Sequence, residues 1–160
     1  MPDGFTIRRL RADDEGEVVF VCRLWRRARG SSMAEMEARV GHTAEDDLGF
    51  FRETILVDRE CWVAVGDVEG AELPLAFLAL EADTLENLYV DPVWQSRRLG
   101  KALLDHAKKR RPAGFTLYTF QANDGARRFY EREGLEAIAF GVAPPPENEP
   151  DVQYAWRPHP

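Results

Sequence analysis

The sequence predicts an α/β domain in which a mixed central sheet of six to seven strands is flanked by about four helices. Its length, its apolar periodicity and the order of its segments all favour this fold. The chain has 160 residues, and one domain usually contains about 100–200. Apolar residues alternate with polar ones in some segments, as in strands, and recur at helical spacing in others. The segments follow the order βααβββαβαββ, so we expect a single domain over residues 1–160 whose strands are partly adjacent and partly joined through helices.

The first third of the chain predicts a strand followed by two helical stretches. Phe5–Leu10 alternates apolar and polar residues, as a short edge strand does. A helix follows the acidic Asp13–Glu15 and is expected to end at about Arg29, because a Gly-Ser-Ser sequence then breaks it. The second helical stretch runs from Met33 to about Leu56 and is interrupted near Thr43, which can cap the turn that follows.

The middle of the chain predicts three strands joined by short turns. Cys61–Val65 is the first strand, and the polar segment Asp67–Glu72 forms the turn after it. Leu73–Glu81 and Leu85–Val90 are the next two strands, with a turn near Asp83.

The last third alternates helices and strands. Pro92 ends the preceding strand, and Gly134 ends the last helix, as glycine often does. The expected elements are a helix from about Arg98 to Lys109, a strand at Phe115–Phe120, a helix at Asp124–Glu133, and strands at Glu136–Gly141 and Val152–Trp156.

The charge is unevenly distributed along the chain. Residues 95–128 carry nine Lys or Arg residues against two acidic ones, a net charge of +7. Because the whole chain has a net charge of −7, the remaining residues total −14. An acidic chain is poorly suited to duplex DNA, whose binding depends on many phosphate contacts, so we expect no nucleic-acid partner. The cationic segment is suited to a small polyanion instead.

Membrane, secretory and metal-binding classes are disfavoured. The longest nearly apolar stretch, Leu73–Leu80, is far shorter than the ~20 residues of a membrane-spanning helix. Met1–Leu10 lacks the apolar core of a signal peptide. Cys22 and Cys61 have no metal-ligand spacing, and the histidines are scattered. We therefore expect two reduced, buried cysteines, no metal, no membrane contact and a cytoplasmic location.

A phosphate-binding arrangement is predicted at the start of the helix after the central strands. Arg97, Arg98 and Lys101 fall near its first turn, where each positive charge opposes the helix dipole by roughly 0.3–1 kcal/mol. A bound anion would offset that repulsion, and the free backbone N–H groups of the first turn would point at it. Gly100 would let the ligand approach the backbone closely. Lys108–Arg111 lie at the other end of this helix, where cations are stabilising, so we interpret them as structural.

Two motifs in this region are similar to those of a known family. Gln95–Leu104 has the sequence QSRRLGKALL and follows LYVDP at Leu88–Pro92. It resembles the acetyl-CoA-binding motif Q/R-x-x-G-x-G/A of the GCN5-related N-acetyltransferases, the GNAT family, and departs from its frequent form at Ser96 and Arg98, where glycine is common. Asn123–Gly134, NDGARRFYEREG, resembles the later family motif N-x-x-A-x-x-F-Y-E-x-x-G. The resemblance implies the GNAT fold and an acetyl-CoA-dependent N-acyltransferase.

The resemblance also implies which residues hold acetyl-CoA, the acyl-donor co-substrate. In relatives, the strand before the pyrophosphate loop separates from its neighbour and exposes backbone groups to the pantetheine arm. A backbone N–H near Val90 would then polarise the thioester carbonyl. By this correspondence, the expected acetyl-CoA-binding residues are Leu88, Tyr89, Val90, Gln95, Ser96, Arg97, Arg98, Leu99, Gly100, Lys101, Ala102, Asn123 and Ala126.

Two side chains are candidates for proton transfer. Tyr130 matches the tyrosine with which relatives often protonate the departing thiolate; its alternative role is aromatic packing. Glu86 is the candidate general base, because it lies four residues before Val90 and hence on the same strand face, with Asn87 facing the other way. A carboxylate there could take the amine proton through a water, provided that burial raises its pKa. The alternatives are an ordinary solvated glutamate, Glu81 as a weaker candidate, or deprotonation by ordered waters alone.

The acceptor is less well defined than the donor. Residues 30–60 hold eight acidic residues against three arginines, a net charge of −5. The resemblance implies that the acceptor is a primary amine of a small molecule or peptide. Negative potential would steer a cationic amine, so we expect a cationic acceptor; solvated helix faces are the equally plain alternative.

Other functions remain open at this point. Arg98 in place of glycine favours a non-catalytic GNAT-fold sensor that binds acyl-CoA without transferring it. A protein N-terminal or lysine acetyltransferase would differ only in its acceptor. The oligomeric state stays open: relatives are often dimers, and the last strands offer an edge at which a homodimer could pair.

Overall fold

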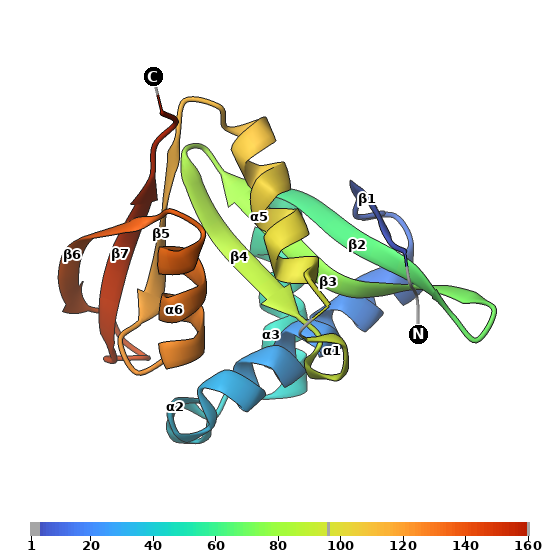
Figure 1. Cartoon of the computed structure of the whole chain (residues 1–160). Coiled ribbons are helices and arrows are strands. Elements are labelled where there is room, and N and C mark those ends of the chain that lie inside the picture. The colour runs from blue at the N-terminus through green and yellow to red at the C-terminus, as the bar shows by residue number, and fades with distance from the viewer. Residues whose placement is uncertain (1–3, 96, 160) are drawn as a thin grey trace.

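A seven-stranded mixed sheet forms the centre of the protein, with the strand order β1-β2-β3-β4-β5-β7-β6 (Figure 1). The computed structural model describes residues 4–95 and 97–159. The sheet confirms the predicted α/β class with a mixed sheet. The strands are β1 (Thr6–Arg9), β2 (Glu60–Val68), β3 (Ala71–Glu81), β4 (Thr84–Val90), β5 (Phe115–Phe120), β6 (Glu136–Val142) and β7 (Pro150–Trp156).

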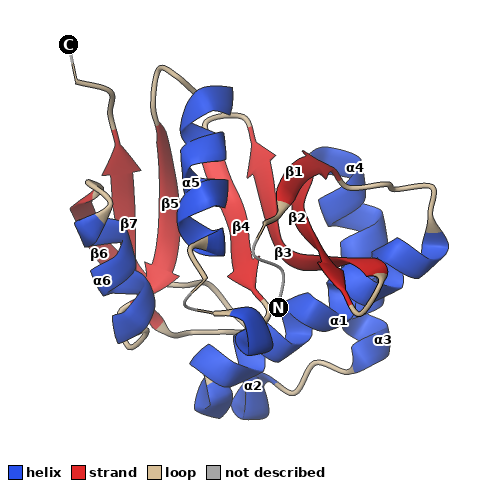
Figure 2. Ribbon diagram, turned by 45° about the vertical axis from the view of Figure 1, so that its right-hand side comes forward, coloured by secondary structure: helices blue, strands red, loops and turns tan. Residues whose placement is uncertain are grey.

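Helices cover both faces of the sheet (Figure 2). On one face, α5 and α6 pack over a core that contains Leu103, Leu104 and Tyr130. On the other face, α1 and the π-helical turn η1 pack over a core that contains Val21 and Phe51. No helix in the described part of the chain is long and apolar enough to cross a membrane. The helices are α1 (Glu15–Ser32), α2 (Ala34–Val40), α3 (Ala44–Phe50), η1 (Phe51–Ile55), α4 (Leu56–Asp58), the 3₁₀ turn η2 (Pro92–Trp94), α5 (Leu99–Arg110) and α6 (Asp124–Arg132).

The first helix is longer than the sequence predicts. We expected Gly30–Ser32 to break it near Arg29, and this was wrong, because α1 continues to Ser32. The Ser32 hydroxyl donates to the carbonyl oxygen of Ala28 at 3.1 Å, which satisfies the serine within the helix. Arg29, in the same turn, pairs with Glu37 and Asp47, so tertiary contacts hold the last turn in place.

The second helical stretch divides where the sequence predicts. Thr43 caps α3: its hydroxyl accepts from the Asp46 backbone N–H at 3.0 Å, and the Asp46 carboxylate accepts from the Thr43 N–H at 2.9 Å. The division of the expected Met33–Leu56 stretch into several short helices raises the helix number above the expected four.

The two cysteines behave as buried apolar residues, as expected. Cys22 and Cys61 are free and buried on the α1 side of the sheet. Burial raises the pKa of each thiol to about 11, so both stay protonated at neutral pH.

The parallel strands β4 and β5 are paired only where they begin. Thr84 and Thr116 are the one pair in register between them within the described residues. Toward their carboxyl ends the strands diverge, which Figure 1 shows beside α5. In α/β sheets, ligands commonly bind outside the carboxyl ends of parallel strands at such a break. The divergence therefore positions the candidate site.

Candidate active site

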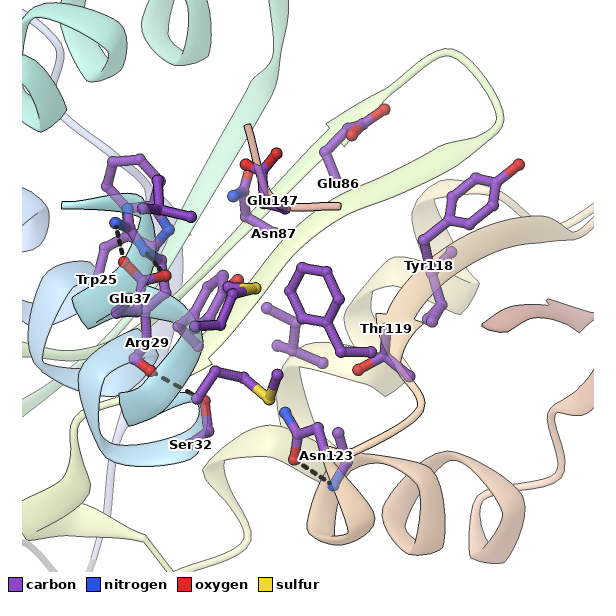
Figure 3. A pocket seen from close by; sticks show the side chains of 18 of the residues that line it. Trp25, Arg29, Ser32, Glu37, Glu86, Asn87, Tyr118, Thr119, Asn123 and Glu147 are labelled. Atoms are coloured by element: carbon purple, nitrogen blue, oxygen red, sulfur yellow. Dashed lines mark hydrogen bonds and ion pairs between the residues drawn. The ribbon is translucent and has the colours of Figure 1, made fainter. Parts of the chain in front are cut away.

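A cavity of about 530 Å³ opens where β4 and β5 diverge (Figure 3). Figure 3 shows Glu86 and Asn87 on β4 and Tyr118 and Thr119 on β5, on the two sides of this opening, with Asn123 at the start of α6. The wall formed by β4, β5 and α6 includes Leu88, Leu117, Phe120, Ala126 and Tyr130. The wall formed by α1, α2, α3 and the loop before β7 includes Met33, Met36, Val40, Phe50 and Glu147.

The start of α5 has the features of an anion site. Arg98, its N-cap residue, has a left-handed backbone with φ of 62°, and its side chain makes no capping hydrogen bond. Within residues 4–95 and 97–159, no side chain caps the first N–H groups of α5, and this end of the helix lies beside Val90 at the carboxyl end of β4. A Cβ on Gly100 would lie 3.5 Å from the Phe129 ring and 3.7 Å from Val90, so this turn is closely packed against α6 and β4.

The predicted pyrophosphate-loop residues contribute in different ways. Arg97 and Arg98 are exposed cations, and Gln95 Nε2 lies 3.5 Å from the Val90 carbonyl oxygen. Leu99 is buried in the core and can offer only its backbone to a ligand. Lys101 Nζ lies 3.0 Å from Glu133 and also pairs with Asp105, so two carboxylates already hold its charge. Ser96 lies outside the described residues, and Ala102 is half-buried on the next turn of α5.

The cations at the other end of α5 are structural, as predicted. Arg110 and Arg111 pair with Glu60 at 2.7 and 3.4 Å, and Arg111 also donates to the Ala82 carbonyl. Lys108 donates to the carbonyl oxygen of Glu133 at 3.1 Å. The cations at the carboxyl end of α5 therefore have structural partners, whereas Arg97 and Arg98 at its start stay exposed.

The predicted pantetheine-side residues meet at the opening. Leu88 and Tyr89 line the pocket, whereas Val90 packs toward α5. Asn123 caps α6, because its Oδ1 accepts from the Ala126 N–H at 3.2 Å. Asn123 and Ala126 both line the cavity, beside Leu88.

Tyr130 lies in the pocket wall and in the core at once. Its ring is 7% exposed and packs against Tyr154 and Phe129, with ring centroids 5.9 and 5.2 Å away. Burial raises the pKa of its hydroxyl above the ordinary value, so the hydroxyl stays protonated at neutral pH. Tyr130 can therefore act as a proton donor whose ring is held in place by packing.

Glu86 reaches the pocket by a route that strand alternation does not predict. A β-bulge separates the pairs Ala79–Asn87 and Leu80–Leu85, so Glu86 is an extra residue without a partner on β3. The expectation that Glu86 and Asn87 face opposite ways was wrong, because both approach the Arg59 guanidinium. Arg59 Nη1 is 2.7 Å from Asn87 Oδ1, and Nη2 is 4.0 Å from Glu86 Oε2. Glu86 is exposed toward the pocket, so the burial that we set as the condition for a general base is absent here.

The acidic character near the acceptor wall is partly neutralised. Glu37 and Asp47 line the pocket but are ion-paired with Arg29, and Asp47 also pairs with Arg26 at 2.8 Å. At the β4 end of the cavity, Glu147 has no ion pair among the described residues, and Glu86 has only the 4.0 Å contact with Arg59. Two carboxylates are thus available there to a cationic group.

Sequence reasoning missed Arg59 and Asn87 as site residues. The available signal for Asn87 was a second polar residue beside Glu86 in the middle of β4. Arg59 carried none, since it stands 28 residues away in sequence and meets Asn87 only through the fold. Among the aromatic residues on the α1 side of the sheet, Trp25 and Phe50 line the pocket, whereas Phe51 is fully buried.

Comparison with known proteins identifies the family. A family model of the acetyltransferase (GNAT) domain matches residues 57–136, half of the 160-residue chain. The chain belongs to the GNAT acetyltransferase family. This GNAT domain is 28% identical over 130 residues to the peptidyl-lysine N-acetyltransferase YjaB of Salmonella typhimurium, across 81% of this chain and 82% of that protein.

Solved structures share the fold of this GNAT domain. The solution structure of apo-form YjaB from Escherichia coli has a TM-score of 0.69 at 23% identity, and the match covers 95% of this chain and 97% of that one. The N-acetyltransferase PaiA of Thermoplasma acidophilum, in complex with coenzyme A, has a TM-score of 0.65 at 19% identity, with 96% and 99% of the two chains covered. The predicted family, fold and acetyl-CoA-dependent N-acetyltransferase class are confirmed.

Proposed function

We propose that this GNAT domain transfers the acetyl group of acetyl-CoA directly to the primary amine of a lysine side chain in a peptide, with a small-molecule amine as the second acceptor class. The observation that carries the proposal is the pocket at the β4–β5 opening, because Tyr130, Glu86 and Glu147 all line it. The lysine acceptor is supported by the names of the relatives, which are peptidyl-lysine N-acetyltransferases.

The acyl donor would lie along the β4–β5 opening. The uncapped N–H groups at the start of α5, with Arg97 and Arg98, would hold its pyrophosphate. The Asn123 side chain and the backbone of Leu88–Val90 would hold the pantetheine arm, and a backbone N–H near Val90 would polarise the thioester carbonyl. The chemistry that acetyl-CoA supplies is an activated acyl group on a thiol leaving group.

Proton transfer would involve Glu86 and Tyr130. Glu86 accepts the amine proton through a water, and the neutral nitrogen then attacks the carbonyl carbon to form a tetrahedral intermediate. The attacking nitrogen loses its remaining extra proton to solvent water. The C–S bond then breaks as the intermediate collapses, and the new C–N bond is retained. Tyr130 donates its hydroxyl proton to the departing thiolate and regains a proton from solvent.

An acceptor panel tests this function. The full chain is incubated with acetyl-CoA and peptides containing lysine, free amino acids, polyamines or aminoglycosides, and thiol release is followed together with the product mass. We expect acetylation of the lysine peptides. Thermal stabilisation by acetyl-CoA without turnover on any amine would instead support the non-catalytic sensor.

A further inference from the structure

Asn87 is a buried polar residue whose hydrogen-bonding capacity is only half used. Three polar or charged side chains are buried among the described residues, those of Asp47, Asn87 and Asp91. Asp47 and Asp91 are both ion-paired with arginines of α1. Asn87 is neutral and 6% exposed, and its amide has one group that accepts and one that donates.

Arg59 fixes the orientation of this amide. A guanidinium only donates hydrogen bonds, so the Asn87 atom that lies 2.7 Å from Arg59 Nη1 must be the oxygen. The Arg59 side chain is itself 13% exposed and is held from other sides by Glu81 at 3.4 Å and by the Phe50 ring, 5.7 Å from its Cζ. The amide therefore cannot turn over without losing a charge-assisted hydrogen bond.

The free amide nitrogen of Asn87 is open to the pocket. Within residues 4–95 and 97–159, Nδ2 donates to no protein acceptor. In the same residues, the buried side-chain nitrogens that lack a hydrogen-bond partner are those of Trp25 and His106. Asn87 Nδ2 is not among them, so this unpaired nitrogen is accessible to solvent. Asn87 lines the cavity, and Figure 3 shows it next to Glu86 on β4. Asn87 Nδ2 is thus a fixed N–H donor beside the carboxylates of Glu86 and Glu147, which only accept.

We infer that Asn87, positioned by Arg59, donates this hydrogen bond to a carbonyl oxygen of the acceptor and so selects amines carried on a peptide. The inference rests on the proposed acetyl transfer to an amine. At neutral pH a polyamine presents only N–H donors, which suit Glu86 and Glu147 but not the Asn87 N–H. A lysine peptide supplies a partner for each of these groups: an ammonium for the carboxylates and a carbonyl oxygen for the Asn87 N–H.

Kinetics with two matched acceptors test the role of Asn87. Nα-acetyl-lysine N-methylamide carries peptide carbonyl groups, and n-pentylamine is an alkylamine without them. Asn87→Asp keeps the acceptor for Arg59 but removes the donor, whereas Asn87→Ala removes both without adding charge. For both variants we expect kcat/KM for the lysine amide, relative to that for pentylamine, to fall about five- to tenfold through KM, as for one neutral hydrogen bond.

Further variants separate this role from general damage. Arg59→Met should lower the same ratio, and Arg59→Lys, which also only donates, should retain most of it. Gln153→Glu on β7, outside the pocket lining, matches the charge change of Asn87→Asp and should leave the ratio unchanged. An unchanged ratio in the Asn87 variants, equal losses on both amines, or a wild-type preference for pentylamine would overturn the role of Asn87 and leave the proposed function standing. A wild-type protein that acetylates neither amine would overturn the proposed function.

Discussion

Replacing Tyr130 with phenylalanine removes one oxygen atom from the pocket and leaves the core intact. The ring contacts with Tyr154 and Phe129 are retained, and the Tyr130 hydroxyl has no hydrogen-bond partner among the described residues. The free energy of unfolding should therefore change by less than about 0.5 kcal/mol, and Tm by about 2 °C or less. A positioned general acid contributes about 10²–10⁴-fold, so kcat should fall at least about 10²-fold.

The pH dependence of this loss identifies its cause. A thiol has a pKa of about 8.5, and above it the leaving thiolate no longer needs a proton. The kcat ratio of wild type to Tyr130→Phe, measured by acetyl transfer to a lysine peptide between pH 6 and about pH 10, should therefore shrink as the pH rises.

Tyr154→Phe is the matched control, with the opposite expected result. The Tyr154 hydroxyl donates to Glu131 at 2.5 Å and accepts from Arg127 at 3.2 Å, outside the pocket lining. Its loss should lower the free energy of unfolding by about 1–2 kcal/mol and leave kcat unchanged. An unchanged kcat in Tyr130→Phe, or a loss of the same size at every pH, would refute the assignment of Tyr130 as the acid.

Three further changes have defined outcomes. Glu86→Gln should lower kcat/KM for the amine by about 10²-fold at pH 7 and less at higher pH, where the amine deprotonates unaided; a pH–rate profile identical to that of the wild type would count against the base. Arg98→Gly should be more stable in denaturant unfolding than Arg98→Ala by about 1 kcal/mol, because only glycine adopts φ near +62° without strain, and equal stabilities would contradict this. The guanidinium of Arg110 holds the pKa of Glu60 at about 2, below its ordinary 4.5, so the contribution of the Glu60 carboxylate is complete above about pH 4.5 and is lost as the pH falls toward 2. Glu60→Gln should therefore lower the free energy of unfolding by about 1–2 kcal/mol at pH 7, after allowance for solvent screening, and match the wild type near pH 2; a constant difference across this range would contradict the assigned cause.

Local chemistry made most of the fold predictable. The caps at Thr43 and Gly134 and the strand at Phe115–Phe120 depend on neighbouring residues, and the structure has them where the sequence indicates. The extension of α1 through Gly30–Ser32 depends on contacts of Arg29 with Glu37 and Asp47, which no local rule contains.

The candidate site was predictable only as far as its motifs reach. Gln95–Ala102 and Asn123–Tyr130 could be assigned because their spacing is local. The direction of Glu86 could not, because the bulge on β4 is defined by its register with β3. The Arg59–Asn87 contact likewise joins two residues that only the folded sheet brings together.

The divergence of β4 and β5 gives the middle of the sheet a property usually confined to its rim. Backbone amide groups at its centre lack a neighbouring strand, so they can exchange hydrogen with solvent even though strands continue on both sides. The two halves of the sheet are joined there by one pair of threonines and by the helices packed across them. A ligand that contacts both halves, at a concentration 100 times its Kd, would raise the free energy of unfolding by about 2.7 kcal/mol. The stability of the connection between the two halves of the sheet would therefore rise with the concentration of a ligand bound between them.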